Sequence, residues 1–258
     1  MARGGRWRGK DMLWRQCMHT VIVCAAAFVA PAAAQAPAAP SGTIRMLLAV
    51  GRLADVTGAP LHFRLVRVTL EAGRTSTYQA DDSVLYVLAG RLTITSEGTR
   101  RALDEGGAAY QAKDMSATLM AEGTRPAVFL RFVLAPPGRL DAPLDAAPAT
   151  VAELHRTATA IPGLRPGPYE FGMTRVLVPP GAKPRPMHYR TGAALYYLLS
   201  GDGELAIQNG ASEMHGAGHV QFEPQSFIHT WSNVGATPLI LLQANLGQEG
   251  VPEIRFLQ

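Results

Sequence analysis

Two stretches near the C-terminal end of the chain decide the fold: GAKPRPMHYRTGAALYYLLSG at residues 181–201 and GHVQFEPQSFIHTWSN at residues 218–233. In both, short apolar runs lie between glycine, proline and asparagine, which is typical of short strands joined by turns. Side chains two residues apart on a strand share one face, so His188 and Arg190 are expected to point into the same interior. The second stretch adds His229, and the two histidines together predict a polar site inside a barrel.

The same pattern of short apolar segments continues along the chain. Segments rich in Val, Ile, Leu, Phe and Tyr run over residues 63–70, 84–88, 128–134 and 239–246, with turn residues between them. Regular spacing of this kind favours an all-β sandwich or barrel. The single helical prediction is residues 150–158, in the connection between the two halves.

The chain also repeats itself at an offset of 111 residues. LYVLAG at 85–90 matches YYLLSG at 196–201, and Gly107 matches Gly218. Two further matches, EAG with PPG and GTRP with GATP, keep the same order at nearly the same offset. Matches in one order at one offset predict two copies of one structural unit.

These motifs resemble those of the cupin superfamily, in particular the bicupins, over nearly the whole chain after the N-terminal segment. The resemblance implies an all-β fold of two tandem cupin barrels, also called double-stranded β-helices or jelly rolls. We expect an N-terminal barrel at residues 43–135, a linker at 136–152 and a C-terminal barrel at 153–258.

The resemblance also implies a degenerate metal motif in the second barrel. Cupins hold Fe, Mn, Ni, Cu or Zn with three histidines and a glutamate, and His188 and His229 match two of those positions. Arg190 stands where the family usually has histidine, and Ala194 stands at the glutamate position. His188 and His229 are therefore the predicted metal ligands if a divalent transition metal is bound, although the cation of Arg190 opposes one.

The first barrel has no good metal ligands at the matching positions, and we expect it to be structural or to form a dimer surface. Those positions hold Thr77, Gln79, Ser83, and either Ala117 or Thr118.

Arg190 supports a different hypothesis, in which the second barrel binds a small organic molecule, with an anion favoured. An interior guanidinium can hold a carboxylate through two hydrogen bonds, and the two histidines can donate hydrogen bonds or act as acid and base. The alternative is that Arg190 pairs internally with Glu204 or Glu223, and that the nearby aromatic residues are core. The predicted ligand-binding residues are His188, Arg190, Tyr196, Phe227, His229 and Trp231.

Four functions stay open at this point: the three described next, and a purely structural or interaction role. The first is the binding protein just described. The second is a metal-dependent oxidoreductase that resembles quercetin dioxygenase and uses His188 and His229. The third is a metal-free isomerase that works by acid–base chemistry. The sequence predicts no catalytic residue for any of them.

The N-terminal segment predicts export. Residues 1–34 combine a basic start, an apolar stretch and small residues up to Ala34, which is typical of a secretory signal peptide cleaved after Ala34. We expect a secreted or periplasmic protein, a disordered leader at residues 35–42 and no stable membrane span after cleavage. The segment contains five of the 24 basic residues, one of the 20 acidic residues and both cysteines. The remaining chain has balanced charge, which excludes an electrostatic nucleic-acid surface. A homodimer stays open.

Overall fold

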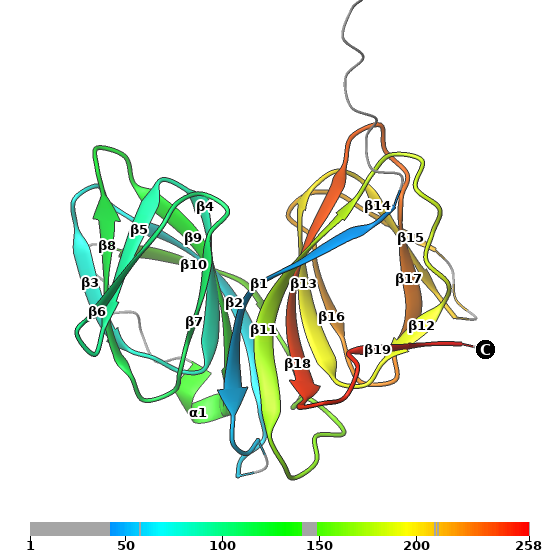
Figure 1. Cartoon of the computed structure of the whole chain (residues 1–258), viewed down its shortest axis with the longest axis horizontal. Helices are drawn as coiled ribbons and strands as arrows, with labels where there is room; N and C mark the ends of the chain where they lie inside the picture. Colours follow the sequence, from blue (N-terminus) through cyan, green and yellow to red (C-terminus); the bar gives the residue numbers. More distant parts are fainter. Residues whose placement is uncertain (1–41, 57, 141–148, 209, 211, 258) are drawn as a thin grey trace, which may run out of the picture. The chain divides into compact units, whose positions relative to one another are not determined.

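The computed structural model describes residues 42–56, 58–140, 149–208, 210 and 212–257, and nearly all of its regular structure is β-strand (Figure 1). The predicted all-β fold is confirmed. The predicted signal peptide and all of the predicted leader except Gly42 lie outside the described residues. No helix among the described residues is long and apolar enough to cross a membrane.

The first barrel consists of two sheets, with strand orders β10-β2-β9-β4-β7 and β3-β8-β5-β6. Its strands are β2 (His62–Leu70), β3 (Thr75–Gln79), β4 (Ser83–Ala89), β5 (Arg91–Ser96), β6 (Thr99–Leu103), β7 (Ala108–Gln111), β8 (Ser116–Glu122), β9 (Ala127–Ala135) and β10 (Ala149–Arg156).

The second barrel is built in the same way, with strand orders β1-β11-β18-β13-β16 and β15-β14-β17-β12-β19. Its strands are β1 (Ile44–Leu53), β11 (Tyr169–Val178), β12 (His188–Arg190), β13 (Ala193–Ser200), β14 (Gly203–Ile207), β15 (Glu213–His215), β16 (Val220–Glu223), β17 (Ile228–Asn233), β18 (Leu239–Gln248) and β19 (Ile254–Phe256).

The two halves exchange their first strands. Strand β1 precedes the first barrel in the chain but pairs with β11 of the second, and β10 pairs with β2 of the first. The predicted linker at 136–152 contains a short helix, α1 (Pro137–Leu140), and the start of β10. The proposed boundary stays a prediction, and strand pairing crosses it in both directions.

The helical prediction for residues 150–158 is wrong. Residues 149–156 form β10, and they pair with β2 from Ala149↔Leu70 to Arg156↔Arg64. Most of β10 is exposed, so little packing distinguishes a helix from a strand there. The free edge of β2 decides the outcome, because its backbone groups need hydrogen-bond partners.

The central sheets are apolar on both faces. On β4, Val84 and Tyr86 belong to a buried cluster that includes residues of both barrels, whereas Leu85 and Val87 belong to the interior of the first barrel. Strand β13 alternates in the same way, and its Tyr196 points into the interior of the second barrel. Burial on both faces explains the nearly continuous apolar runs in the sequence.

Candidate functional site in the second barrel

Strands β12 and β17 bring the two predicted histidines together. The strands pair antiparallel with His188 directly opposite His229. The two imidazole centroids are 4.7 Å apart at an interplanar angle of 52°. Both side chains are buried, with His188 6% exposed and His229 fully buried.

Backbone carbonyls fix one nitrogen of each ring. His188 Nδ1 lies 3.0 Å from the carbonyl oxygen of Pro186, and His229 Nδ1 lies 3.1 Å from that of Phe227. Because a carbonyl oxygen only accepts, each Nδ1 is assigned as the donor. Burial, opposed by the Pro186 bond but reinforced by nearby cations, lowers the pKa of His188 to about 4. His188 is therefore neutral at pH 7, and its Nε2 is an acceptor.

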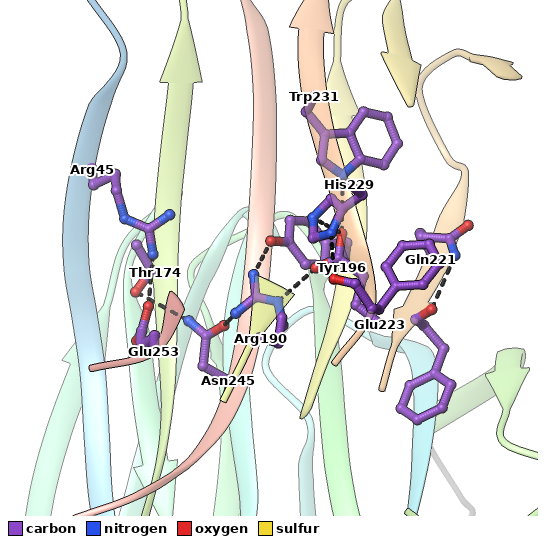
Figure 2. A network of polar contacts seen from close by, with 12 residues as sticks. Arg45, Thr174, Arg190, Tyr196, Gln221, Glu223, His229, Trp231, Asn245 and Glu253 are labelled. Carbon is purple, nitrogen blue, oxygen red and sulfur yellow. Dashed lines mark hydrogen bonds and ion pairs between the residues drawn. The ribbon is translucent and has the colours of Figure 1, made fainter. Parts of the chain in front are cut away.

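Arg190 is held inside the protein by three partners (Figure 2). Its Nε donates to Glu223 Oε2 at 2.6 Å, its Nη1 donates to Asn245 Oδ1 at 2.8 Å, and its Nη2 contacts the hydroxyl of Tyr196. Arg190 is 2% exposed and Glu223 is fully buried. The charge of Arg190 is therefore balanced inside the protein. Of the two carboxylates considered from the sequence, Glu204 and Glu223, the partner is Glu223.

Strand register explains why Glu223 is the carboxylate that pairs with Arg190. Glu223 on β16 lies opposite Ala194 on β13, so the neighbouring strand supplies the carboxylate that is missing at position 194. Burial alone would raise the pKa of Glu223, but the charge of Arg190 and the contact with His229 lower it to about 2. Glu223 is therefore ionised at neutral pH and balances the charge of Arg190.

Glu223 also contacts His229 and Trp231. Its Oε1 lies 2.9 Å from His229 Nε2 and accepts a 3.1 Å hydrogen bond from Trp231 Nε1. Both ring nitrogens of His229 thus face protein oxygens. The Nε2 contact is an ion-pair distance only, because this buried nitrogen has no hydrogen-bond partner among the described residues.

The three predicted aromatic residues have different surroundings in the second barrel. Tyr196 and Trp231 stack with centroids 6.3 Å apart and belong to the buried cluster of the second barrel. Phe227 is partly buried and stacks on His229 at 5.0 Å. The structure adds Asn245 and Phe256, which the sequence reasoning missed because their strands lie far along the chain.

Comparison with solved structures identifies the architecture. A variant of Bacillus subtilis oxalate decarboxylase matches with a TM-score of 0.53 and 13% identity, covering 84% of this chain and 80% of that chain. The Lactobacillus farciminis oxalate decarboxylase formate complex matches with a TM-score of 0.54 and 13% identity, covering 84% and 90%. The chain has a two-barrel cupin fold. A scan against protein-family models and a search of curated proteins found no match.

The residues of this cupin barrel do not fit a resident transition metal. Another matching structure of the B. subtilis enzyme is described as having Mn(II) centres. Here, among the described residues, no group of three His, Cys, Asp or Glu side chains could hold a metal ion. The carboxylate beside His229 is bonded to Arg190, whose permanent positive charge opposes a second cation.

A cationic pocket lies near the histidine pair. It has a volume of about 460 Å³ and is lined by Thr43, Arg45, Lys183, Pro184 and Arg185. Arg45 pairs with Glu253 at 2.7 Å (Figure 2), but among the described residues neither of the other two cations has a carboxylate within ion-pair distance.

Phe256 lies near both Arg185, which lines this pocket, and His188. The guanidinium carbon of Arg185 lies 5.3 Å from the centroid of the Phe256 ring, and the same ring lies 5.8 Å from the imidazole of His188. Burial, together with the charges of Arg45 and Arg190, lowers the pKa of Arg185. Arg185 is thus a half-buried cation in a positive environment, which favours an anion as its partner.

Proposed function

We propose that this protein binds a small organic anion at the second cupin barrel. The observation that carries the proposal is the cationic pocket beside Phe256 and His188, in which Lys183 and Arg185 have no carboxylate partner among the described residues. An anion held there compensates charge that the described residues leave unbalanced. Guanidinium and ammonium groups are the usual partners of carboxylates and phosphates.

The proposal moves the site from the residues that the sequence suggested. Arg185 and Lys183 take the recognition role first assigned to Arg190, whose charge is balanced by Glu223. Phe256 provides an apolar surface between Arg185 and His188. The neutral His188 accepts a hydrogen bond at Nε2, so a ligand with both an anionic group and a hydroxyl fits best.

The two enzymatic alternatives have weaker support. A metal-dependent oxidoreductase needs a metal site that the charge of Arg190 opposes. An acid–base isomerase needs a tuned pair of groups open to the substrate. His229 is fully buried, with Nδ1 bonded to a backbone carbonyl, and the pKa of His188 is lowered to about 4, which makes His188 a weak base at neutral pH.

We also propose that the protein is exported to the periplasm or beyond. Support comes from the basic and apolar composition of residues 1–34 and from the small residues that end at Ala34. Both cysteines lie within that segment, so the exported chain needs no disulfide chemistry.

Titration calorimetry with citrate as the probe tests the binding site. Citrate carries several carboxylates and a hydroxyl, and neutral glycerol is the matched control. We expect citrate to bind, glycerol not to bind, and Arg185→Gln to weaken citrate binding by about tenfold or more, since a charge-assisted contact contributes about 1.5–3 kcal/mol. Salt should weaken binding in the unsubstituted chain.

Arg67→Gln is the matched control, because Arg67 is an exposed arginine on β2 of the other barrel. It should leave citrate affinity unchanged. Equal citrate affinity in the Arg185→Gln and unsubstituted chains would contradict the proposal.

A further inference from the structure

The interior of the first barrel contains a buried arginine without a carboxylate partner. Arg131 lies on β9 opposite Leu85 and Val66, whose side chains belong to the interior cluster of that barrel. It is 5% exposed, and among the described residues no carboxylate lies within ion-pair distance of it. Asp81 contributes attraction, but it is itself paired with Arg139 at 2.7 Å. A buried charge without a partner is costly, so the site favours an anion.

Unpaired polar atoms surround this guanidinium. Arg131 Nη2, Tyr78 Oη and Gln111 Oε1 are all buried and have no hydrogen-bond partner within the described part of the chain. The residues are also linked to one another. The guanidinium carbon of Arg131 lies 4.5 Å from the centroid of the Tyr78 ring, and Arg131 Nε donates to Ser83 Oγ over a long 3.3 Å. Gln111 lies directly opposite Ser83 on the neighbouring strand. Native proteins rarely leave several buried polar atoms unpaired at one place.

Comparison of the two barrels shows what is missing. Ser83 and Ala194 are the matching positions of the repeat, and their cross-strand partners are Gln111 in the first barrel and Glu223 in the second. At this position the second barrel has a carboxylate, which pairs with Arg190 on β12, and the first barrel has a neutral amide, although its own buried arginine, Arg131, lies on β9 rather than on the strand that matches β12. Among the described residues no carboxylate takes this position beside Arg131.

A pocket reaches one member of this group, Gln111, while Arg131 and Tyr78 lie behind its lining. It has a volume of about 290 Å³ and is lined by Gln111, by residues of β5, β6 and β7, and by Met115. This volume is close to the lower end of the range for ligand pockets, about 300–1,000 Å³. Its lining includes the apolar side chains of Ile94, Ala109 and Met115, and the polar side chains of Ser96, Thr99, Arg101 and Tyr110 besides Gln111. The pocket suits a small molecule with an apolar body.

We propose that the first barrel is a second ligand site, which binds a small monocarboxylate between Arg131, Tyr78 and Gln111. The carboxylate accepts hydrogen bonds from Arg131 Nη2 and the Tyr78 hydroxyl. The apolar body of the ligand lies in the pocket beside Gln111. The barrel that the sequence assigned a structural role thus becomes a binding domain independent of the cationic pocket.

Benzoate is the probe for this site, with neutral benzyl alcohol as the matched control of similar size. We expect benzoate to raise the Tm of the full chain and to bind in calorimetry, and benzyl alcohol to do neither. Gln111→Glu is the decisive variant, because it supplies the carboxylate that the second barrel already has. It should raise the Tm of the ligand-free chain and lower benzoate affinity by about tenfold or more.

Two further variants separate the possible outcomes. Arg131→Met should remove the preference for benzoate over benzyl alcohol. Arg185→Gln should leave benzoate binding unchanged, so a failure at the cationic pocket is distinguishable from a failure here. If Arg131→Met does not fold, Gln111→Glu still tests whether Arg131 binds the benzoate carboxylate, because that variant retains Arg131. Benzoate binding that persists at full affinity in Gln111→Glu, or that is absent from the folded unsubstituted chain, would overturn the proposal.

Discussion

At the scale of single residues, Glu223 holds the most consequential position in the second barrel. It contacts Arg190, His229 and Trp231, and its side chain is completely buried. We predict that Glu223→Gln lowers the free energy of unfolding by about 3–5 kcal/mol, because it leaves the buried guanidinium without its counter-charge. Urea denaturation followed by the fluorescence of Trp231 measures this loss.

The double variant Arg190→Met, Glu223→Leu provides the control for that prediction. Replacing a buried ion pair by apolar residues of similar size is often nearly neutral. The double variant should therefore be more stable than Glu223→Gln alone. If it is no more stable, loss of packing rather than an unpaired charge explains the effect. Glu204→Gln, a partly exposed glutamate on β14, should change little.

The residue scale also shows where sequence reasoning ends. The period of two residues places His188 and Arg190 on one face, and the structure has both side chains buried. The partners of Arg190 depend on register, since Glu223 and Asn245 are 33 and 55 residues away in the chain. The sequence offered Glu223 only as one of two alternatives, and Asn245 gave no signal. That Arg131 has no carboxylate partner among the described residues depends on three neighbouring strands and is not visible in any one of them.

At the scale of elements, the exchange of β1 and β10 could not be predicted from the sequence. The repeat predicts two barrels and so most of the architecture. It does not say which barrel the first strand of each half joins, because both barrels have a similar free edge. The exchange shapes the cationic pocket, since Thr43 and Arg45, next to and on β1, line it together with residues 183–185 of the second half.

Truncation tests the contribution of β1. A chain that begins at residue 42 retains every described strand and should keep its Tm. A chain that begins at residue 54 leaves the edge of β11 uncovered and removes Leu53 from the buried cluster. We expect its Tm to fall by about 10 °C or more, because each kcal/mol corresponds to about 2–4 °C in a chain of this size, and we expect it to aggregate through the open edge.

Differential scanning calorimetry measures the Tm of the two truncated chains, and size-exclusion chromatography shows whether either chain aggregates. Equal melting temperatures would mean that β1 contributes little to the second barrel. The citrate titration adds an independent readout, because loss of Arg45 should weaken binding even if the shorter chain folds.

At the scale of the whole described molecule, one buried cluster joins the two barrels. It includes Phe63 and Leu130 from the first barrel and Phe171 and Leu195 from the second, and the rings of Phe63 and Phe171 have centroids 6.0 Å apart. With the exchanged strands, this cluster makes each barrel dependent on the other. The barrels should therefore unfold in one transition rather than two.

Trp231 makes this prediction testable, because it is the only tryptophan after residue 34 and lies in the interior of the second barrel. Leu119→Ala removes a fully buried side chain from the interior of the first barrel and should cost about 2–5 kcal/mol. If the barrels are coupled, the denaturation midpoint reported by Trp231 shifts by the same amount as the midpoint from circular dichroism. Leu205→Ala, in the second barrel, is the positive control. A Trp231 midpoint that stays fixed in Leu119→Ala while circular dichroism shifts would show two independent barrels, and the shared cluster would then be an interface rather than a common core.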